Sequence, residues 1–257
     1  MSLLSKEEIE RYARHIMLRE VGGPGQQRLK RATVALVGVG GLGAPAALYL
    51  AAAGVGALRL IDDDQVSLSN LQRQILFTTQ SLGQGKTETA AAALTALNPH
   101  VIVDQRPTRL TPETAQTLLQ GADLVLDGSD SFSTRFAVNA ACHALGVPLV
   151  SGAVGRWDGQ LGLFASGLTK AKPAAERLPC YRCFVPEEPP EAETCAAVGV
   201  IGALPGVIGA AMALEAVKHL TGAGQTLSGR LWLFDGLNLE SRTVVLPRDP
   251  ACPVCGD

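Results

Sequence analysis

The chain has 257 residues, of which 47% are hydrophobic and 18% are charged, and its formal net charge is -2. This composition is typical of a well-packed α/β protein, excludes a disordered chain and gives no broad positive surface for nucleic acid. The N-terminus has no apolar core of the signal-peptide type, and no apolar run of membrane-spanning length is free of Gly, Pro or charge, so we expect a cytoplasmic protein without a membrane partner.

The first predicted element is an amphipathic helix over residues 5–16. Ser5 is followed three residues later by Glu8, which is the pattern of a capping box. The run from Gly22 to Gly25, which contains Pro24, is expected to break this helix. Residues 1–30 are therefore predicted to form an N-terminal helical arm.

Strand and helix patterns then alternate up to about residue 150. We expect strands over residues 33–37, 57–61, 101–105, 124–126 and 148–150. Helices are expected over residues 44–53, 86–97, 112–120 and 133–145. This alternation predicts a Rossmann-like, doubly wound and mainly parallel sheet over residues 31–150.

The sequence pattern changes in the second half, residues 151–257. Strands are expected over residues 159–164, 230–234 and 243–246, in a part of the sheet that is antiparallel. A Pro- and Glu-rich segment, residues 184–197, is predicted to be a crossover loop. An apolar helix is expected over residues 198–220, interrupted near Pro205. We treat residues 1–257 as one domain.

A glycine-rich loop lies between the first predicted strand and the next helix. Gly38, Gly40 and Gly43 form the pattern G-x-G-x-x-G, which in this strand-loop-helix context predicts a nucleotide site at a helix N-terminus. Gly41 lies within the same loop. Asp62 follows the next strand, roughly 20 residues further on, where a ribose-binding carboxylate is expected. Taken alone, these features would predict an NAD site.

A polar and cationic cluster after this second strand favours a nucleotide that reacts at its phosphates. Arg73 and Lys86 can stabilise charge on a polyphosphate, and Asn70 can position an oxygen by hydrogen bonding. Asp130 follows the fourth predicted strand, whose carboxyl end faces the same crevice, so it is a candidate Mg²⁺ ligand. Each residue alone could be a solvated loop charge or a helix cap, but together on one crevice they favour a site.

Four cysteines occur in two C-x-x-C pairs, a spacing typical of a closed structural zinc site. Two unrelated thiol pairs, or one redox motif, are the alternatives. A closed four-sulfur site would fasten the C-terminal tail to the body of the protein. The predicted ligands are Cys180, Cys183, Cys252 and Cys255.

The other two cysteines have different sequence surroundings. Cys142 lies among small residues of a predicted helix and is expected in the core. Cys195 comes just before a predicted helix, whose dipole would lower the thiol pKa and favour a reactive thiolate. An inert cysteine is the alternative for Cys195.

Together these segments resemble the ubiquitin-activating-like adenylyltransferases of sulfur carriers, the MoeB, ThiF and HesA group, and are closest in pattern to MoeB. The resemblance covers nearly the whole chain, and its order and spacing make it specific. It rests on Arg11 to Arg14, Gly38 to Gly43, Asp62 to Asp64, Ser69 to Gln74, Lys86, Asp127 to Asp130, Pro179 to Cys183, Cys195 and the final C-x-x-C.

The resemblance implies a homodimer that binds Mg-ATP and a small ubiquitin-like sulfur carrier with a Gly-Gly C-terminus, held by the second half of the chain. The carrier carboxylate would attack the α-phosphate and form an acyl-adenylate, for molybdopterin, thiamin or related sulfur-transfer biosynthesis. Electrostatic positioning by Arg73 and Lys86 would accelerate this step. Arg14 would enter the site of the neighbouring subunit.

The family pattern also assigns individual residues. Cys195 matches a crossover-loop cysteine that some members use covalently. Because the chain ends at Asp257 without a rhodanese-like domain, sulfur is expected from a separate donor such as a cysteine desulfurase or rhodanese. The residues implied in nucleotide binding are Gly38, Gly40, Gly41, Gly43, Asp62, Asp64, Ser69, Asn70, Gln72, Arg73, Lys86, Asp130 and Ser131.

Two other function classes compete with the adenylyltransferase. An NAD-dependent oxidoreductase would explain the glycine loop and Asp62, but not Arg73 or Lys86. A non-catalytic scaffold of the same fold would explain the cysteine pairs and the core. The four histidines, on predicted helices or next to Pro99, are expected to be structural.

Overall fold

The computed structural model describes residues 4–188 and 199–257. Its strands are β1 Thr33–Val37, β2 Ala57–Ile61, β3 Ile102–Arg106, β4 Leu124–Asp127, β5 Leu149–Val154, β6 Asp158–Phe164, β7 Arg230–Asp235 and β8 Glu240–Val245. Its α-helices are α1 Lys6–Arg11, α2 Ala13–Ile16, α3 Gly22–Arg31, α4 Gly43–Ala53, α5 Lys86–Leu97, α6 Ala115–Leu119, α7 Phe132–Leu145, α8 Ser166–Thr169, α9 Tyr181–Phe184 and α11 Ala203–Thr221. Short 3-10 turns are η1 Leu68–Asn70, η2 Thr79–Ser81 and η3 Ala174–Glu176.

The described strands form one sheet in the order β3-β2-β1-β4-β5-β6-β7-β8. The pairs from β3 to β5 are all parallel, and the pairs from β5 to β8 are antiparallel. The predicted doubly wound sheet with an antiparallel C-terminal part is confirmed. Strand β5 crosses residue 150, so the two halves of the chain share a continuous sheet.

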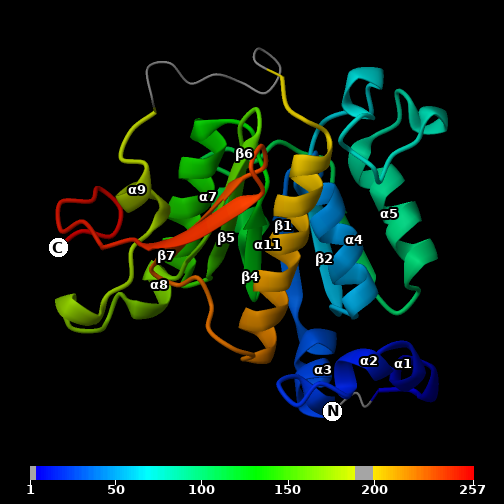
Figure 1. Cartoon of the computed structure of the whole chain (residues 1–257), viewed down its shortest axis with the longest axis horizontal. Helices are drawn as coiled ribbons and strands as arrows, with labels where there is room; N and C mark the ends of the chain where they lie inside the picture. Colours follow the sequence, from blue (N-terminus) through cyan, green and yellow to red (C-terminus); the bar gives the residue numbers. More distant parts are fainter. Residues whose placement is uncertain (1–3, 189–198) are drawn as a thin grey trace.

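Helices cover both faces of the sheet (Figure 1). On one face α4 and α11 pack against each other and share a core with the inward residues of β1, β2 and β4. On the other face α6 and α7 pack over a second core that includes Tyr181. Helix α11 is the described helix long and apolar enough to cross a membrane, but it packs against β5 and β6 as a core helix.

The N-terminal arm differs from its prediction. The capping box of Ser5 and Glu8 is present, but the helix splits at Tyr12 into α1 and α2. The helical run ends at Ile16 as predicted, but the run from Gly22 to Gly25 is itself helical, because α3 begins there. Pro24 occupies its first turn, where an amide hydrogen has no helical partner to lose.

Two later helices also differ from their predictions. Helix α6 is shorter than expected and begins at Ala115. Helix α11 begins at Ala203 and is not interrupted at Pro205, which again lies in the first turn. The start of the predicted 198–220 helix was therefore wrong, while its end at Thr221 is close to the prediction.

Candidate active site

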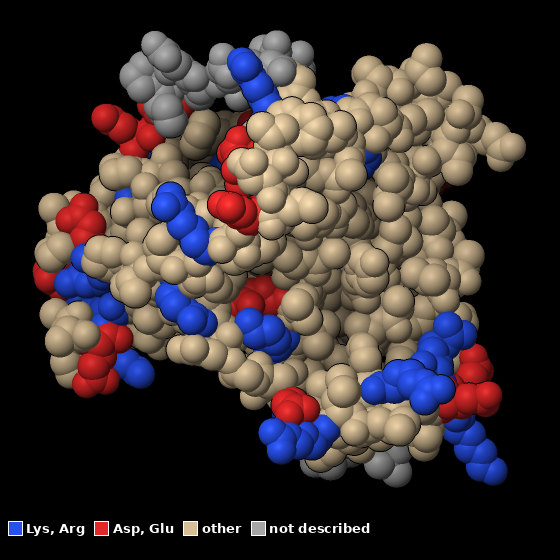
Figure 2. Space-filling model, viewed as in Figure 1, with Lys and Arg blue, Asp and Glu red and all other residues tan. Residues whose placement is uncertain are grey.

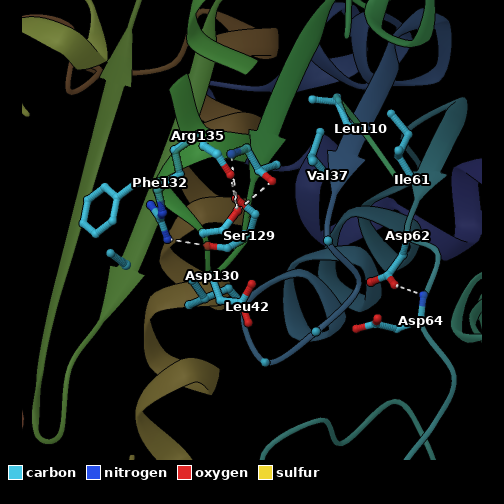
Figure 3. A pocket seen from close by; sticks show the side chains of 18 of the residues that line it. Val37, Leu42, Ile61, Asp62, Asp64, Leu110, Ser129, Asp130, Phe132 and Arg135 are labelled. Atoms are coloured by element: carbon cyan, nitrogen blue, oxygen red, sulfur yellow. Dashed lines mark hydrogen bonds between the residues drawn. The ribbon is translucent and has the colours of Figure 1, made fainter. Parts of the chain in front are cut away.

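A pocket opens at the carboxyl ends of β1, β2 and β4, beside the glycine loop (Figure 3). This is the edge at which open α/β sheets bind ligands. One end of the pocket is lined by the loop after β3, and the other by α9 and by Val200, just before α11. The described lining residues that the site uses are Gly38, Gly40, Gly41, Asp62, Asp64, Arg73, Gln74, Lys86, Asp130, Ser131, Arg135 and Tyr181.

The glycine loop has the geometry of an anion site. Gly38 has a φ of +83°, and its amide donates to Ile61 O at 2.9 Å. Gly43 is the first residue of α4, and a Cβ at this position would collide with the Gly38 carbonyl. The tight turn therefore requires both glycines. It leaves the N-terminus of α4 facing the pocket, where unpaired amides favour a phosphate.

Three charged side chains meet at the end of β2. Lys86 begins α5 and is 4% exposed, and its Nζ donates to Asp64 Oδ2 at 2.7 Å and lies 4.0 Å from Asp62 Oδ2. Asp62 Oδ2 accepts from the Val39 amide at 2.7 Å, which ties the acid to the glycine loop. Lys86 and Asp62, both predicted to bind the nucleotide, therefore lie side by side next to the glycine loop.

The carboxyl of Asp62 is held in a mostly dry position. Burial raises its pKa, and Lys86 together with the amides of Val39 and Asp64 opposes that rise without cancelling it. Lys86 is therefore the cation that opposes the effect of burial on the pKa of Asp62.

The segment around η1 turns a guanidinium toward the glycine loop. Arg73 Nη2 donates to Asn70 Oδ1 at 3.0 Å, and Nη1 donates to Ser69 O at 3.2 Å. The Arg73 side chain also lies near Gly41, where it lines the pocket. Gln72 is different: its carbonyl and side chain point toward Gly202 at the start of α11, and it is not among the pocket-lining residues.

The loop after β4 forms another side of the pocket. Asp130 lines the pocket, and Ser131 caps α7 by accepting from the Thr134 amide at 3.3 Å. Figure 3 shows Asp62 and Asp64 on one side of the glycine loop and Asp130 on the other. Carboxylates therefore flank the position where the loop amides would hold phosphates.

The sequence interpretation did not assign several pocket residues to the site, among them Gln74, Arg135 and Tyr181. Gln74 is 5% exposed and its Oε1 has no hydrogen-bond partner among the described residues, while Arg135 and Tyr181 also line the pocket. Gln74 directly follows Arg73 in the same motif, so its position was a usable signal. Arg135 and Tyr181 reach the pocket through long-range packing, which no local pattern encodes.

The two cysteine pairs come together as predicted. The four sulfurs lie within 4.8 Å of one another, with Cys180 and Cys252 at 3.5 Å and Cys183 and Cys255 at 3.4 Å. Four thiolates bound to zinc at about 2.3 Å are roughly 3.8 Å apart, so the cluster fits a tetrahedral ion. The buried Cys142 lies outside this cluster, in the core as predicted.

One cysteine of the cluster, Cys183, favours the thiolate form. Hydrogen bonds from Cys180 and Cys255 lower the pKa of Cys183 to about 2, assisted by the Asp249 amide. Thiolate, not thiol, is the form that binds metal. The close spacing of the four sulfurs is what would let them hold a metal ion together.

Several predicted site residues do not line this pocket. Gly43, Ser69, Asn70 and Gln72 belong to the neighbouring loops without lining it, and two others lie elsewhere. Arg14 lies in α2, which packs on α3 at the amino end of β1, whereas the pocket is at the carboxyl end (Figure 1). Cys195 and most of the predicted crossover loop lie outside the described residues.

Comparisons with known proteins identify the family. The ThiF family profile matches residues 12–254. The chain belongs to the ThiF family. A sulfur carrier protein adenylyltransferase of Thermus thermophilus is 48% identical over 98% of this chain and 93% of its own length. The molybdopterin-synthase adenylyltransferase of Salmonella typhimurium is 43% identical over the full length of both chains.

Solved structures share the fold of this ThiF-family chain. A crystal structure of Escherichia coli MccB with ATP is 23% identical, with a TM-score of 0.76 over 91% of this chain and 70% of that chain. The resemblance predicted from sequence, to the MoeB, ThiF and HesA group, is confirmed by the family match and by both relatives.

Proposed function

We propose that this adenylyltransferase uses ATP to activate the C-terminal Gly-Gly carboxylate of a small ubiquitin-like sulfur carrier. The observation that carries the proposal is the convergence of Arg73, Lys86 and Asp130 around one glycine loop. Nucleotide chemistry at a phosphate requires such charges, whereas hydride transfer does not. The names of the two relatives support the same reaction and substrate class.

The proposed reaction is an exchange of bonds at the α-phosphorus. A carrier carboxylate oxygen forms a bond to that phosphorus, and the bond to the oxygen bridging the α- and β-phosphates breaks, which releases pyrophosphate. The carboxylate is ionised at neutral pH, so no protein base is required. Arg73 and Lys86 would offset the negative charge that develops, while the loop amides and Asp62 hold the nucleotide.

Two metal ions are part of the proposal. Asp130 would hold Mg²⁺, which neutralises polyphosphate charge. Zinc would bind Cys180, Cys183, Cys252 and Cys255 and fasten the C-terminal tail. The close sulfur cluster supports zinc, and the carboxylate flanking the glycine loop supports magnesium.

We also propose a homodimer. Arg14 lies at the end of the sheet opposite the pocket, so it could reach an active site only in a second copy. Exposed apolar side chains support this partner: Tyr49 on α4 is 60% exposed, and Leu214 on α11 is 63% exposed. Figure 2 shows few charges over these helices.

The sulfur donor is proposed to be a separate protein, such as a cysteine desulfurase or rhodanese. Among the described residues that line the pocket there is no cysteine. Cys195 stays a candidate covalent thiol at a later transfer step. We place the enzyme in the cytoplasm.

Pyrophosphate exchange tests the proposal directly. Purified protein, Mg²⁺, ATP and a Gly-Gly-ended carrier should together move labelled pyrophosphate into ATP. A carrier that lacks its last two glycines is the matched control and should give no exchange. If ATP binds but no carrier encoded in the same genome supports exchange, the enzyme proposal fails and a scaffold role is favoured.

Two variants assign the roles. Arg73→Ala should abolish exchange and change the free energy of unfolding by only about 0.5 kcal/mol, because its contacts are at a pocket surface. Arg106→Ala, an exposed arginine on β3, should exchange normally. Cys195→Ala should still form the adenylate. Normal turnover in Arg73→Ala would remove its assigned role, and loss of the adenylate in Cys195→Ala would contradict a later role for that thiol.

A further inference from the structure

Arg135 is a buried arginine beneath the pocket. It lies on α7 and is 7% exposed, although arginine is rarely buried unless it is paired. Its Nη1 lies 3.9 Å from Asp127 Oδ2, and Asp127 is fully buried at the end of β4. The charge of Arg135 is thus compensated inside the protein, without a ligand.

The guanidinium joins three separate pieces of the pocket wall. Nη1 donates to Gly152 O at 3.0 Å and to Ser151 Oγ at 3.3 Å on β5. Nη2 donates to Ser129 O at 2.5 Å in the loop after β4. The side chain itself belongs to α7, so these contacts connect α7, β5 and the loop after β4. Figure 3 shows Arg135 directed at the Ser129 loop from the side of the sheet.

The loop that Arg135 anchors is also held at its start, directly after β4. Asp127 Oδ1 accepts from the Ser129 amide at 3.0 Å and from Ser129 Oγ at 2.6 Å. Gly38 is packed so closely against this loop that its Cβ would lie 3.2 Å from the Gly128 carbonyl oxygen and 3.3 Å from the Ser129 nitrogen. A shift of the Ser129 carbonyl would therefore move both Asp130, the next residue, and the glycine loop.

We propose that Arg135 is a positioning residue that fixes Asp130 relative to the glycine loop, and so sets the affinity for the divalent ion held with ATP. This inference rests on the proposed function, since it needs Asp130 to face metal-bound nucleotide. Arg135 acts through the Ser129 carbonyl and the Asp127 pair, and both of its terminal nitrogens donate to protein acceptors.

A lysine cannot replace this arrangement. The planar guanidinium spans the Gly152 carbonyl and the Ser129 carbonyl with two different nitrogens, whereas one ammonium is a single point charge. Arg135→Lys keeps the charge that Asp127 needs, so it avoids an unpaired buried carboxylate and is expected to fold. It loses the bridge between β5 and the loop, which is the feature under test.

The experiment measures metal affinity and catalysis separately. Mn²⁺ binding to the protein with a non-hydrolysable ATP analogue is followed by electron paramagnetic resonance, and pyrophosphate exchange is followed against Mg²⁺ concentration. Arg135→Lys should weaken Mn²⁺ binding by about 10-fold, which corresponds to about 1.4 kcal/mol. The half-saturating Mg²⁺ concentration should rise by a similar factor.

His143→Gln is the matched control on the same helix. His143 Nδ1 is 2.9 Å from Ser166 Oγ, two turns beyond Arg135 and away from the Ser129 loop. This variant can lower the melting temperature, but its Mn²⁺ affinity should equal that of the wild type. A purely structural role of Arg135 predicts a lower melting temperature and a uniform loss of activity at every Mg²⁺ concentration.

The outcomes separate this inference from the proposed function. If Arg135→Lys exchanges pyrophosphate at the wild-type rate and binds Mn²⁺ with the wild-type affinity, the positioning role is overturned. The adenylation proposal is not affected by that result. Absence of exchange in the wild type would overturn the adenylation proposal, and the Mn²⁺ comparison would still decide the role of Arg135. Weaker Mn²⁺ binding in Arg135→Lys but not in His143→Gln supports the inference.

Discussion

Lys86 Nζ lies 2.7 Å from Asp64 Oδ2 and 4.0 Å from Asp62 Oδ2, so one buried ammonium serves two carboxyl groups. A lysine that is 4% exposed would be costly without these partners. These ion pairs link the loop after β2 to Lys86, the first residue of α5. It also places the cation beside the acid that accepts from the glycine-loop amide.

Lys86→Gln should make ATP binding more sensitive to acid. Burial already raises the pKa of Asp62, and Lys86 opposes this, so removing the cation raises that pKa further. Protonated Asp62 is a poorer acceptor for ribose hydroxyls, and ATP affinity should therefore fall at a higher pH than in the wild type. Calorimetric titration with ATP between pH 5 and 8 measures this shift.

The exposed Lys172 provides the control for lost charge. Lys172→Gln should bind ATP with the wild-type pH dependence. Superimposable profiles for Lys86→Gln and the wild type would contradict the coupling between Lys86 and Asp62.

Local patterns predicted the parts of the fold that depend on neighbours in sequence. The bounds of β1 and β2 agree with the prediction at every residue, because turn-forming residues flank two apolar runs. Helix α3 was missed because Gly22 and Pro24 favour a turn. Its stability comes from tertiary contacts, such as the bond from Gln26 Nε2 to Ala53 O at 2.8 Å.

The same distinction applies to the pocket. Arg73 and Lys86 were found because their motifs follow strand ends, where parallel sheets bind ligands. Arg135 was not, because its role depends on the pairing of β4 with β5, which brings Asp127 opposite Ser151. Long-range register of this kind has no signature in a single sequence.

Gly202→Ala should disturb the segment that carries Arg73. A Cβ at Gly202 would collide with the Gln72 carbonyl oxygen and with its side-chain oxygen. The backbone cannot yield easily, so we expect a loss of about 1–3 kcal/mol in the free energy of unfolding. Exchange activity should fall as well, because Gln72 and Arg73 are neighbours. Chemical denaturation and pyrophosphate exchange measure the two effects.

Gly206→Ala is the control for the loss of a glycine. Gly206 lies in α11 with open space around its Cβ position, so alanine should stabilise the helix by about 0.5–1 kcal/mol. Equal behaviour of the two variants would show that the Gln72 contact has no effect.

The cysteine cluster should contain about one zinc ion per chain, as four thiolates at this spacing predict. Cys180→Ser should lose most of this zinc. Its melting temperature should fall by roughly 10 °C or more, since a structural metal contributes several kcal/mol to folding. Elemental analysis and thermal unfolding provide the two readouts. Cys142→Ala should keep its zinc, because Cys142 is buried outside the cluster; equal zinc contents in both variants would reject the assigned ligands.

Glu8→Gln should destabilise the N-terminal arm at neutral pH but not at low pH. Burial alone would raise the pKa of Glu8, but the Lys30 ammonium and the Ser5 amide, each 2.7 Å from Oε2, lower it below its ordinary value of 4.5. A lowered folded-state pKa means that the ionised group stabilises the fold above pH 4.5, and that this contribution is lost as the pH falls through the folded-state value. We expect a loss of about 2 kcal/mol in the free energy of unfolding at pH 7, typical of hydrogen bonds to a charged group.

Denaturant unfolding from pH 7 to pH 3 should show the stabilities of Glu8→Gln and the wild type converging. Glu10→Gln, at an exposed position of the same helix, should follow the wild type throughout. A constant difference between Glu8→Gln and the wild type across this range would mean that packing, and not the charge of Glu8, holds the arm in place.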